Sequence, residues 1–204
     1  MNPRDADPKK RSRLAAHERR DQLVAAAAKL LSAGGVEALE FTAVAAEAGV
    51  TRPVVYKFFP TRLALVEAIL ADFEAELTAR FFAAAAGRMT GSLEGATRVF
   101  VDAICEAIEA KGAGAWELLG GHAADPEIAA LGRAVQARLM KPWYRQIAGA
   151  TAASKREVQT VSAMLVAAGR AVLARWYAGE LSRAEAARAA TLGVSALLEA
   201  FSRR

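Results

Sequence analysis

The chain of 204 residues has very few of the residue types on which many functional sites depend. A single cysteine, Cys105, excludes an intramolecular disulfide and a cysteine-rich zinc site, and we expect it to be a buried, inert thiol rather than a redox sensor. Two histidines, His17 and His122, are too few for a histidine-rich metal centre. The sequence has neither a Gly-x-Ser-x-Gly elbow nor a phosphate-binding loop. We therefore expect no metal, no cofactor and no enzymatic activity.

Patterns typical of β-strands and long apolar stretches are also scarce. The 5 isoleucines and 15 valines do not alternate with polar residues, which argues against a large β-sheet, whereas alanine, the best helix former, occurs 51 times. The longest run without a charged residue, 158–169, has 12 residues, and a membrane-spanning helix needs about 20. The N-terminus lacks the apolar core of a secretory signal. These features predict an all-α, cytoplasmic protein with no membrane partner.

The positive charge is concentrated near the N-terminus. Residues 1–20 hold seven basic and three acidic residues, a net charge of +4, out of +5 for the whole chain. We interpret residues 1–16 as a disordered basic arm that lies along a polyanion, although a solubilising tail explains the same composition.

Helical periodicity and capping residues predict helices along the remaining chain. The expected ranges are 17–33, 42–49, 51–59, a long helix capped by Thr61, 93–110, 115–119, one opened by Asp125 and Pro126, 155–178 and 183–202. Gly34 and Gly35 end the first helix, and we expect Pro142 to kink or end the helix that contains it. Capping boxes at 154–157 and 182–185 open the last two helices.

Residues 42–59 form a candidate helix–turn–helix. Ala45 and Ala48 are small enough for two helices to cross closely, and Gly49 suits a left-handed turn. The outer face of the second helix carries an arginine that reads guanine, an apolar side chain for a thymine methyl and a lysine for phosphate: Arg52, Val54 and Lys57. Hydroxyl groups of Thr42, Thr51 and Tyr56 would donate to phosphates. A helical hairpin in an ordinary core is the structural alternative.

Residues 19–70 resemble the DNA-binding domain of the TetR family of bacterial transcriptional regulators. The resemblance rests on RRDQL at 19–23, AAKLL at 27–31, GVEA at 35–38, FTAVAAEAGVT at 41–51 and YKFFPTRLAL at 56–65. It implies phosphate contacts from Thr42, Thr51, Tyr56 and Arg62, and a groove-facing surface of Arg52, Pro53, Val54 and Lys57. The chain departs from the family pattern at Pro53, at Phe58 and at Arg62, which replaces the usual lysine.

The resemblance further implies that the DNA-binding domain, residues 17–62, precedes a helical ligand-binding and dimerisation domain, residues 63–204. Large apolar residues make a candidate ligand pocket there: Phe100, Trp116, Met140, Trp143, Tyr144, Met164 and Trp176. Aromatic residues at helical spacing are also typical of a core. Apolar positions on the last two helices make a candidate dimer interface: Val161, Leu165, Val172, Val194, Leu197, Leu198 and Phe201.

Together these observations predict a homodimeric transcriptional regulator, most simply a repressor, that binds a palindromic double-stranded DNA operator and is released by a small apolar or amphipathic effector. Two alternatives stay open: a DNA-binding regulator that needs no ligand, and a helical small-molecule-binding protein that does not bind DNA.

Overall fold

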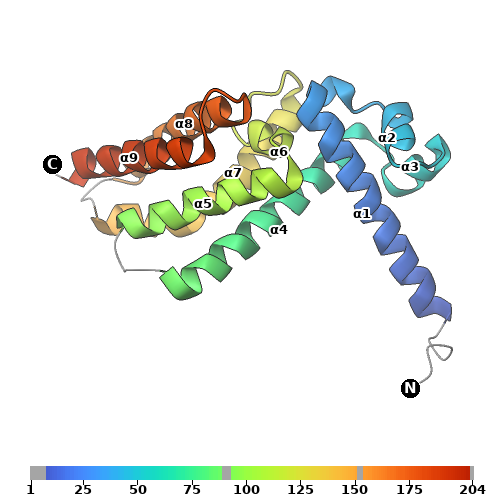
Figure 1. Ribbon diagram of the computed structural model, residues 1–204, viewed down its shortest axis with the longest axis horizontal. Coiled ribbons are helices and arrows are strands. Elements are labelled where there is room, and N and C mark those ends of the chain that lie inside the picture. Colours follow the sequence, from blue (N-terminus) through green and yellow to red (C-terminus); the bar gives the residue numbers. More distant parts are fainter. Residues whose placement is uncertain (1–7, 89–92, 151–153, 203–204) are drawn as a thin grey trace. The chain divides into compact units, whose positions relative to one another are not determined.

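The computed structural model describes residues 8–88, 93–150 and 154–202, and every regular element within these ranges is helical (Figure 1). The elements are α1 (Pro8–Gly34), a 3-10 turn (Val36–Ala38), α2 (Phe41–Glu47), α3 (Arg52–Phe58), α4 (Arg62–Arg88), α5 (Leu93–Lys111), α6 (Gly114–Leu118), α7 (Pro126–Ala150), α8 (Lys155–Tyr177) and α9 (Arg183–Ser202). The all-α prediction is confirmed.

The contacts divide the chain into two compact units, residues 1–72 and 73–204, with the division inside α4. The N-terminal unit contains α1, α2, α3 and the start of α4. Its core is made of fully buried side chains at helical spacing, among them Leu23, Val44, Val55 and Leu65. Burial of this shared apolar face holds the two short helices α2 and α3, which are too short to be stable alone.

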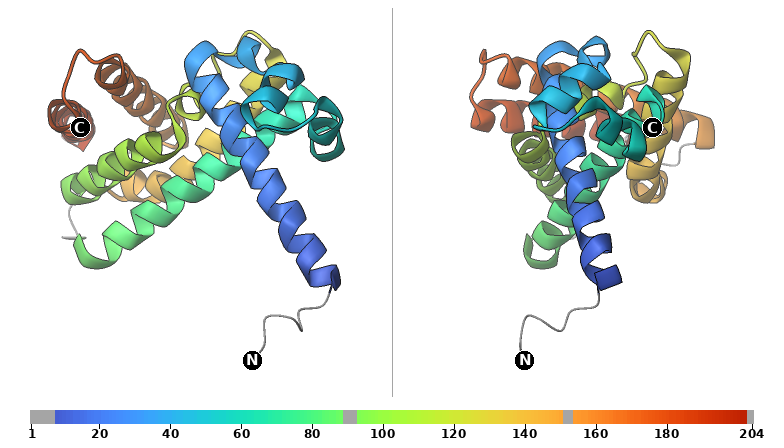
Figure 2. Two further views of the ribbon diagram at one scale, coloured as in Figure 1. Left: turned by 45° about the vertical axis from the view of Figure 1, so that its right-hand side comes forward. Right: turned by 90° about the vertical axis from the view of Figure 1, so that its right-hand side faces the viewer.

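The C-terminal unit is a helical bundle. In it α9 packs against both α8 and α5, and α7 packs against α8 (Figures 1 and 2). One cluster of its core joins Ala96, Met140, Val158, Val161 and Leu165. The bundle therefore buries one face of α8, and the face opposite carries exposed residues.

The predicted caps explain where several helices begin. Asp125 Oδ1 accepts from the backbone N–H of Glu127 at 2.8 Å, at the start of α7. Ser154 and Glu157 form a complete capping box before α8. Ser182 Oγ likewise accepts from the N–H of Glu185 before α9. Each bond satisfies an N–H group that the first helical turn leaves without an intrahelical partner.

Two boundaries differ from the prediction. α1 begins at Pro8 and not at 17, so residues 8–16, which we predicted as arm, are helical; residues 1–7 lie outside the described residues. Proline suits the first helical position and the lysines, arginines and alanines that follow are good helix formers. α7 continues through position 142 to Ala150 instead of ending there. Pro142 therefore does not end the helix, and the kink predicted at this residue stays a prediction.

By length and hydropathy alone, α8 is long and apolar enough to cross a membrane, a property that the prediction from uncharged runs did not anticipate. Its buried face packs against α7 and α9, and Arg170 on it is paired with Glu117 of α6. These contacts bury one face of α8, and 28% of its most apolar stretch is buried.

Candidate functional site

The turn between α2 and α3 has the geometry that a helix–turn–helix requires. Gly49 adopts a φ of 64°, in the left-handed region, and the N–H of Val50 donates to Ala45 O at 2.9 Å. Ala45 and Ala48 are buried where the helices meet. Gln22 Nε2 donates to Ala48 O at 2.8 Å, which ties α1 to the end of α2. Sequence reasoning missed this role of Gln22, because a glutamine on a helix face is usually solvated.

The outer face of α3 is solvent-exposed. Arg52, Pro53 and Lys57 are exposed and Val54 is half-buried, whereas Val55, on the opposite face, is fully buried. Thr51 precedes the helix in an extended conformation and, within the described part of the chain, makes no side-chain capping bond. Its hydroxyl is therefore not used by the helix that it precedes.

Tyr56 connects α3 to the start of α2. Its ring makes an edge-to-face contact with Phe41, with centroids 4.7 Å apart. Arg52 lies on Tyr56 as well: its Nη2 donates to the phenolic oxygen at 2.9 Å, and its guanidinium carbon is 5.3 Å from the ring centroid. These contacts hold the guanidinium group of Arg52 next to the hydroxyl group of Tyr56 on α3.

An open cleft of about 310 Å³ brings together several of the predicted DNA-binding residues. Its walls include the hydroxyl-bearing residues Thr42, Tyr56 and Thr61 and the cations Arg52 and Arg62. Thr61 was expected only to cap α4, and its Oγ1 does accept from the N–H of Ala64 at 3.1 Å. Arg62 Nη1 lies 3.6 Å from Glu37 Oε2, an exposed ion pair that costs little to break. The cleft thus combines hydroxyl groups and two arginines with one carboxylate, that of Glu40.

The C-terminal unit contains an apolar cavity of about 70 Å³ between α5, α6, α7, α8 and α9. Three predicted pocket residues line it: Phe100, Trp116 and Met140. Met164 is 44% exposed and Trp176 is half-buried, and neither lines the cavity. The side chains of Trp143 and Tyr144 lie outside the described residues.

The residues predicted for a dimer interface occupy different environments. Val161 is 1% exposed and Leu165 is 7% exposed, so both belong to the core of one copy rather than to an interface. Leu165 and Val194 line the cavity. Val172 is half-buried, and Leu197 and Phe201 are half-buried and pack against the core cluster. The side chain of Leu198 lies outside the described residues.

Exposed apolar side chains lie on both α8 and α9, among charged ones. Leu192, on α9, is 72% exposed and is the most exposed of the large apolar side chains in the described part of the chain. It lines a surface hollow between α5 and α9 together with charged residues, among them Asp102 and Arg188. On α8 the exposed apolar residues are Ala163, Met164, Ala167 and Ala171.

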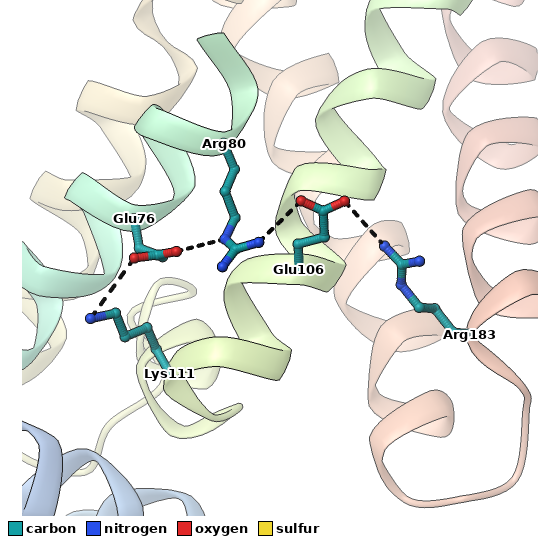
Figure 3. Close-up of polar contacts among 5 residues, drawn as sticks. All are labelled: Glu76, Arg80, Glu106, Lys111 and Arg183. Atoms are coloured by element: carbon teal, nitrogen blue, oxygen red, sulfur yellow. Dashed lines mark hydrogen bonds and ion pairs between the residues drawn. The ribbon is translucent and has the colours of Figure 1, made fainter. Parts of the chain in front are cut away.

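A chain of ion pairs joins α4, α5 and α9 (Figure 3). Arg80 Nε lies 2.6 Å from Glu76 and its Nη1 lies 3.2 Å from Glu106, which in turn faces Arg183 at 3.7 Å. Lys111 Nζ completes the chain 3.9 Å from Glu76. Hydrogen bonds to the two carboxylates raise the pKa of Arg80. The network orients these helices with respect to one another within the C-terminal unit.

Cys105 and the two histidines do not form a reactive centre within the described residues. The thiol is buried, and burial raises the pKa of Cys105 to about 11. His17 Nδ1 lies 2.7 Å from Asp21, one turn away on an exposed face. His122 Nδ1 accepts from Arg170 at 2.8 Å, because a guanidinium can only donate. Among the described residues, no three metal-ligating side chains gather at one point.

Comparisons with known proteins agree with this geometry. Residues 23–69 match the family model described as bacterial regulatory proteins, tetR family. A comparison with curated protein sequences found no match. The fold is similar to that of a TetR-family transcriptional regulator from Streptomyces coelicolor, with 22% identity, a TM-score of 0.68, and 92% of this chain and 88% of that chain covered. It is also similar to a TetR-like regulator from Rhodococcus sp. RHA1, with 20% identity, a TM-score of 0.67, and 89% and 93% covered.

The N-terminal unit is therefore a helix–turn–helix DNA-binding domain, and the protein is a transcriptional regulator. Residues 23–69 are a DNA-binding domain of the tetR family of bacterial regulatory proteins. The structural similarity extends over the C-terminal unit and there concerns the fold alone.

Proposed function

We propose that the protein is a cytoplasmic, homodimeric repressor that binds a palindromic DNA operator and releases it when a small apolar effector binds, and that it has no catalytic activity. In this proposal the DNA-binding domain comprises residues 17–62, and residues 63–204 bind the effector and the second copy. The alternatives are a regulator that needs no effector and a ligand-binding protein that does not bind DNA.

The observation that supports DNA binding most directly is the cleft shared by α2, α3 and the start of α4. Thr42, Tyr56 and Arg62 would contact phosphates from it, and Thr61 is a further candidate. Thr51 would contact phosphate at the N-terminus of α3. Arg52, Pro53, Val54 and Lys57 would face the major groove, because the first turns of a recognition helix reach the base edges.

Dimerisation is supported by the exposed apolar residues of α8 and α9. A single helix–turn–helix contacts too little DNA for tight specific binding, so two copies must be held at a fixed separation. Packing of these two helices against their symmetry mates would cover Met164 on α8 and Leu192 on α9, with alanines allowing close approach. Leu197 and Phe201, which we predicted at the dimer interface, would contact the second copy through the part of each side chain that is exposed.

The apolar cavity in the C-terminal unit supports the proposal that a small effector binds there. A ligand that binds one arrangement of the C-terminal unit better than another shifts the population of that arrangement, and the affinity for DNA changes by the same coupling free energy. The experiment that tests the proposal is a fluorescence-anisotropy titration of the full chain with DNA from upstream of its own gene and with scrambled DNA. Equal affinity for both DNAs would reject specific operator binding.

A further inference from the structure

A surface hollow of about 710 Å³ lies between α5 and α9, which pack side by side (Figure 1). This volume is within the range of about 300–1,000 Å³ that is usual for small-molecule sites. The hollow shares no wall residue with the apolar cavity of the C-terminal unit. It is therefore a separate place at which the protein could hold a ligand.

The wall of this hollow carries unpaired side chains of both signs. Glu94, Arg98 and Asp102 follow one another at intervals of four residues along α5, and Arg188 lies on α9. Side chains four residues apart on a helix commonly pair, yet none of these four forms an ion pair or a hydrogen bond with another described residue. Asp102 is half-buried and the other three are exposed, so a ligand can reach each charge.

The two other charged residues of the wall are engaged. Arg183 lies 3.7 Å from Glu106 and 3.3 Å from Glu109, and Glu199 is not free either. The charges that remain for a ligand are therefore two cations and two anions. A ligand with a single charge would face side chains of its own sign as well as of the opposite sign, whereas a ligand with both charges can pair with both.

The remainder of the wall is aliphatic or carries hydroxyl groups. Leu192 is 72% exposed, and Ala187 and Thr191 lie beside it on α9. The Oγ atom of Ser195, another wall residue, is buried and has no hydrogen-bond partner among the described residues. A buried hydroxyl without a partner is unfavourable, and a polar group of a ligand in the hollow would supply one.

We infer that this hollow binds a zwitterion with a short aliphatic segment, of the class of the ω-amino acids. Its ammonium group would lie against Glu94 or Asp102, and its carboxylate against Arg98 or Arg188. Four residues span about 6 Å along a helix, which matches the separation of the two charges in a chain of roughly four to six carbons. The inference goes beyond the proposed function, with which it shares only Leu192.

The test uses three probes of equal chain length, namely 6-aminohexanoate, hexanoate and hexylammonium. Each is titrated calorimetrically into the full chain at pH 7 and low salt, without DNA. 6-Aminohexanoate should bind at least about 5-fold more tightly than either probe with a single charge, because it forms one additional ion pair.

Two variants assign the charges of the ligand to the wall. Asp102→Asn should weaken binding of 6-aminohexanoate about 3-fold and should not weaken binding of hexanoate. Arg188→Gln should weaken binding of 6-aminohexanoate by a similar factor and should not weaken binding of hexylammonium. Glu127→Gln and Arg133→Gln are the matched controls, because they neutralise exposed charges of α7 that do not line the hollow. Circular dichroism establishes that each variant is folded.

The inference is overturned if 6-aminohexanoate does not bind, if a probe with a single charge binds as tightly, or if the two variants change binding no more than the controls do. Anisotropy with operator DNA separates this result from the proposed function. Specific DNA binding by a protein that does not bind 6-aminohexanoate would reject only the inference about the hollow. Binding of 6-aminohexanoate by a protein without specific DNA binding would reject only the proposed function.

Discussion

The guanidinium group of Arg52 lies against the ring of Tyr56, one helical turn further along α3, and donates a hydrogen bond of 2.9 Å to its hydroxyl. Both side chains are exposed and line the same cleft. The contact restricts the rotamers of an otherwise flexible arginine side chain.

Replacing Arg52 with alanine should cost about 1–3 kcal/mol of binding free energy on the operator and relax the preference at one base pair. The reason is that Arg52 lies in the first turn of α3, which in the proposed complex would reach base edges. Anisotropy titrations with every single-base variant of the site measure both effects. Unchanged affinity and base preference would contradict the placement of α3 in the groove.

Arg62→Ala should weaken binding to all DNA sequences alike and reduce the slope of log K against log salt by about 1. Its partner, Glu37, is an exposed carboxylate 3.6 Å away, so loss of that pair has little effect on folding. Arg133→Ala, at an exposed position of α7, is the control and should leave the slope unchanged. A loss of affinity that depends on the base at a single position of the site would instead assign Arg62 to base recognition.

Deletion of residues 1–13 removes five basic residues: Arg4, Lys9, Lys10, Arg11 and Arg13. If the segment follows the duplex, DNA affinity should fall most at low salt, because screening shortens the range of these charges. Salt titrations of both proteins decide the question. Superimposable curves would mean that the segment only increases solubility.

Leu192→Asp should convert a dimer into a monomer and abolish tight operator binding. The substitution places a charge at the most exposed large apolar side chain of α9, where it stays solvated in a single copy but would be buried in the proposed dimer. Sedimentation at micromolar concentration measures the mass. Phe82→Asp, at another highly exposed apolar position, is the control; a dimer that persists in Leu192→Asp would place the interface elsewhere. Leu197→Asp is less informative, because Leu197 packs against the core cluster of its own copy.

Cys105 should react very slowly with a thiol reagent in the folded protein at pH 8. With a pKa of about 11, only about one thiol in a thousand is ionised at that pH, and the group is buried as well. Unfolding in denaturant should restore the rate of an ordinary cysteine. Rapid labelling of the native protein would show that α5 opens or that the thiol is not buried.

The sequence was most informative where a local signal decides the structure. The serine–glutamate pairs before α8 and α9 place both helix starts, because a capping box satisfies backbone donors within four residues. Gly49 predicted the turn because glycine adopts the left-handed conformation that the turn requires. The start of α1 was misplaced, since charge alone does not distinguish a helical segment rich in lysine and arginine from a disordered one.

Which face of a helix turns inward was much less predictable. Met164 and Leu165 are adjacent and both apolar, yet one is exposed and the other lines the cavity.

The central claim is that two copies of this chain read one two-fold symmetric DNA site through α3. Its most direct test is to select binding sequences from random double-stranded DNA with the full chain, and then to measure the mass of the complex by sedimentation. The account predicts an inverted repeat, one or more dimers per duplex, and loss of the selected preference in Arg52→Ala. Recovery of unrelated sequences, or a complex containing a single chain on a single half-site with full affinity, would contradict it.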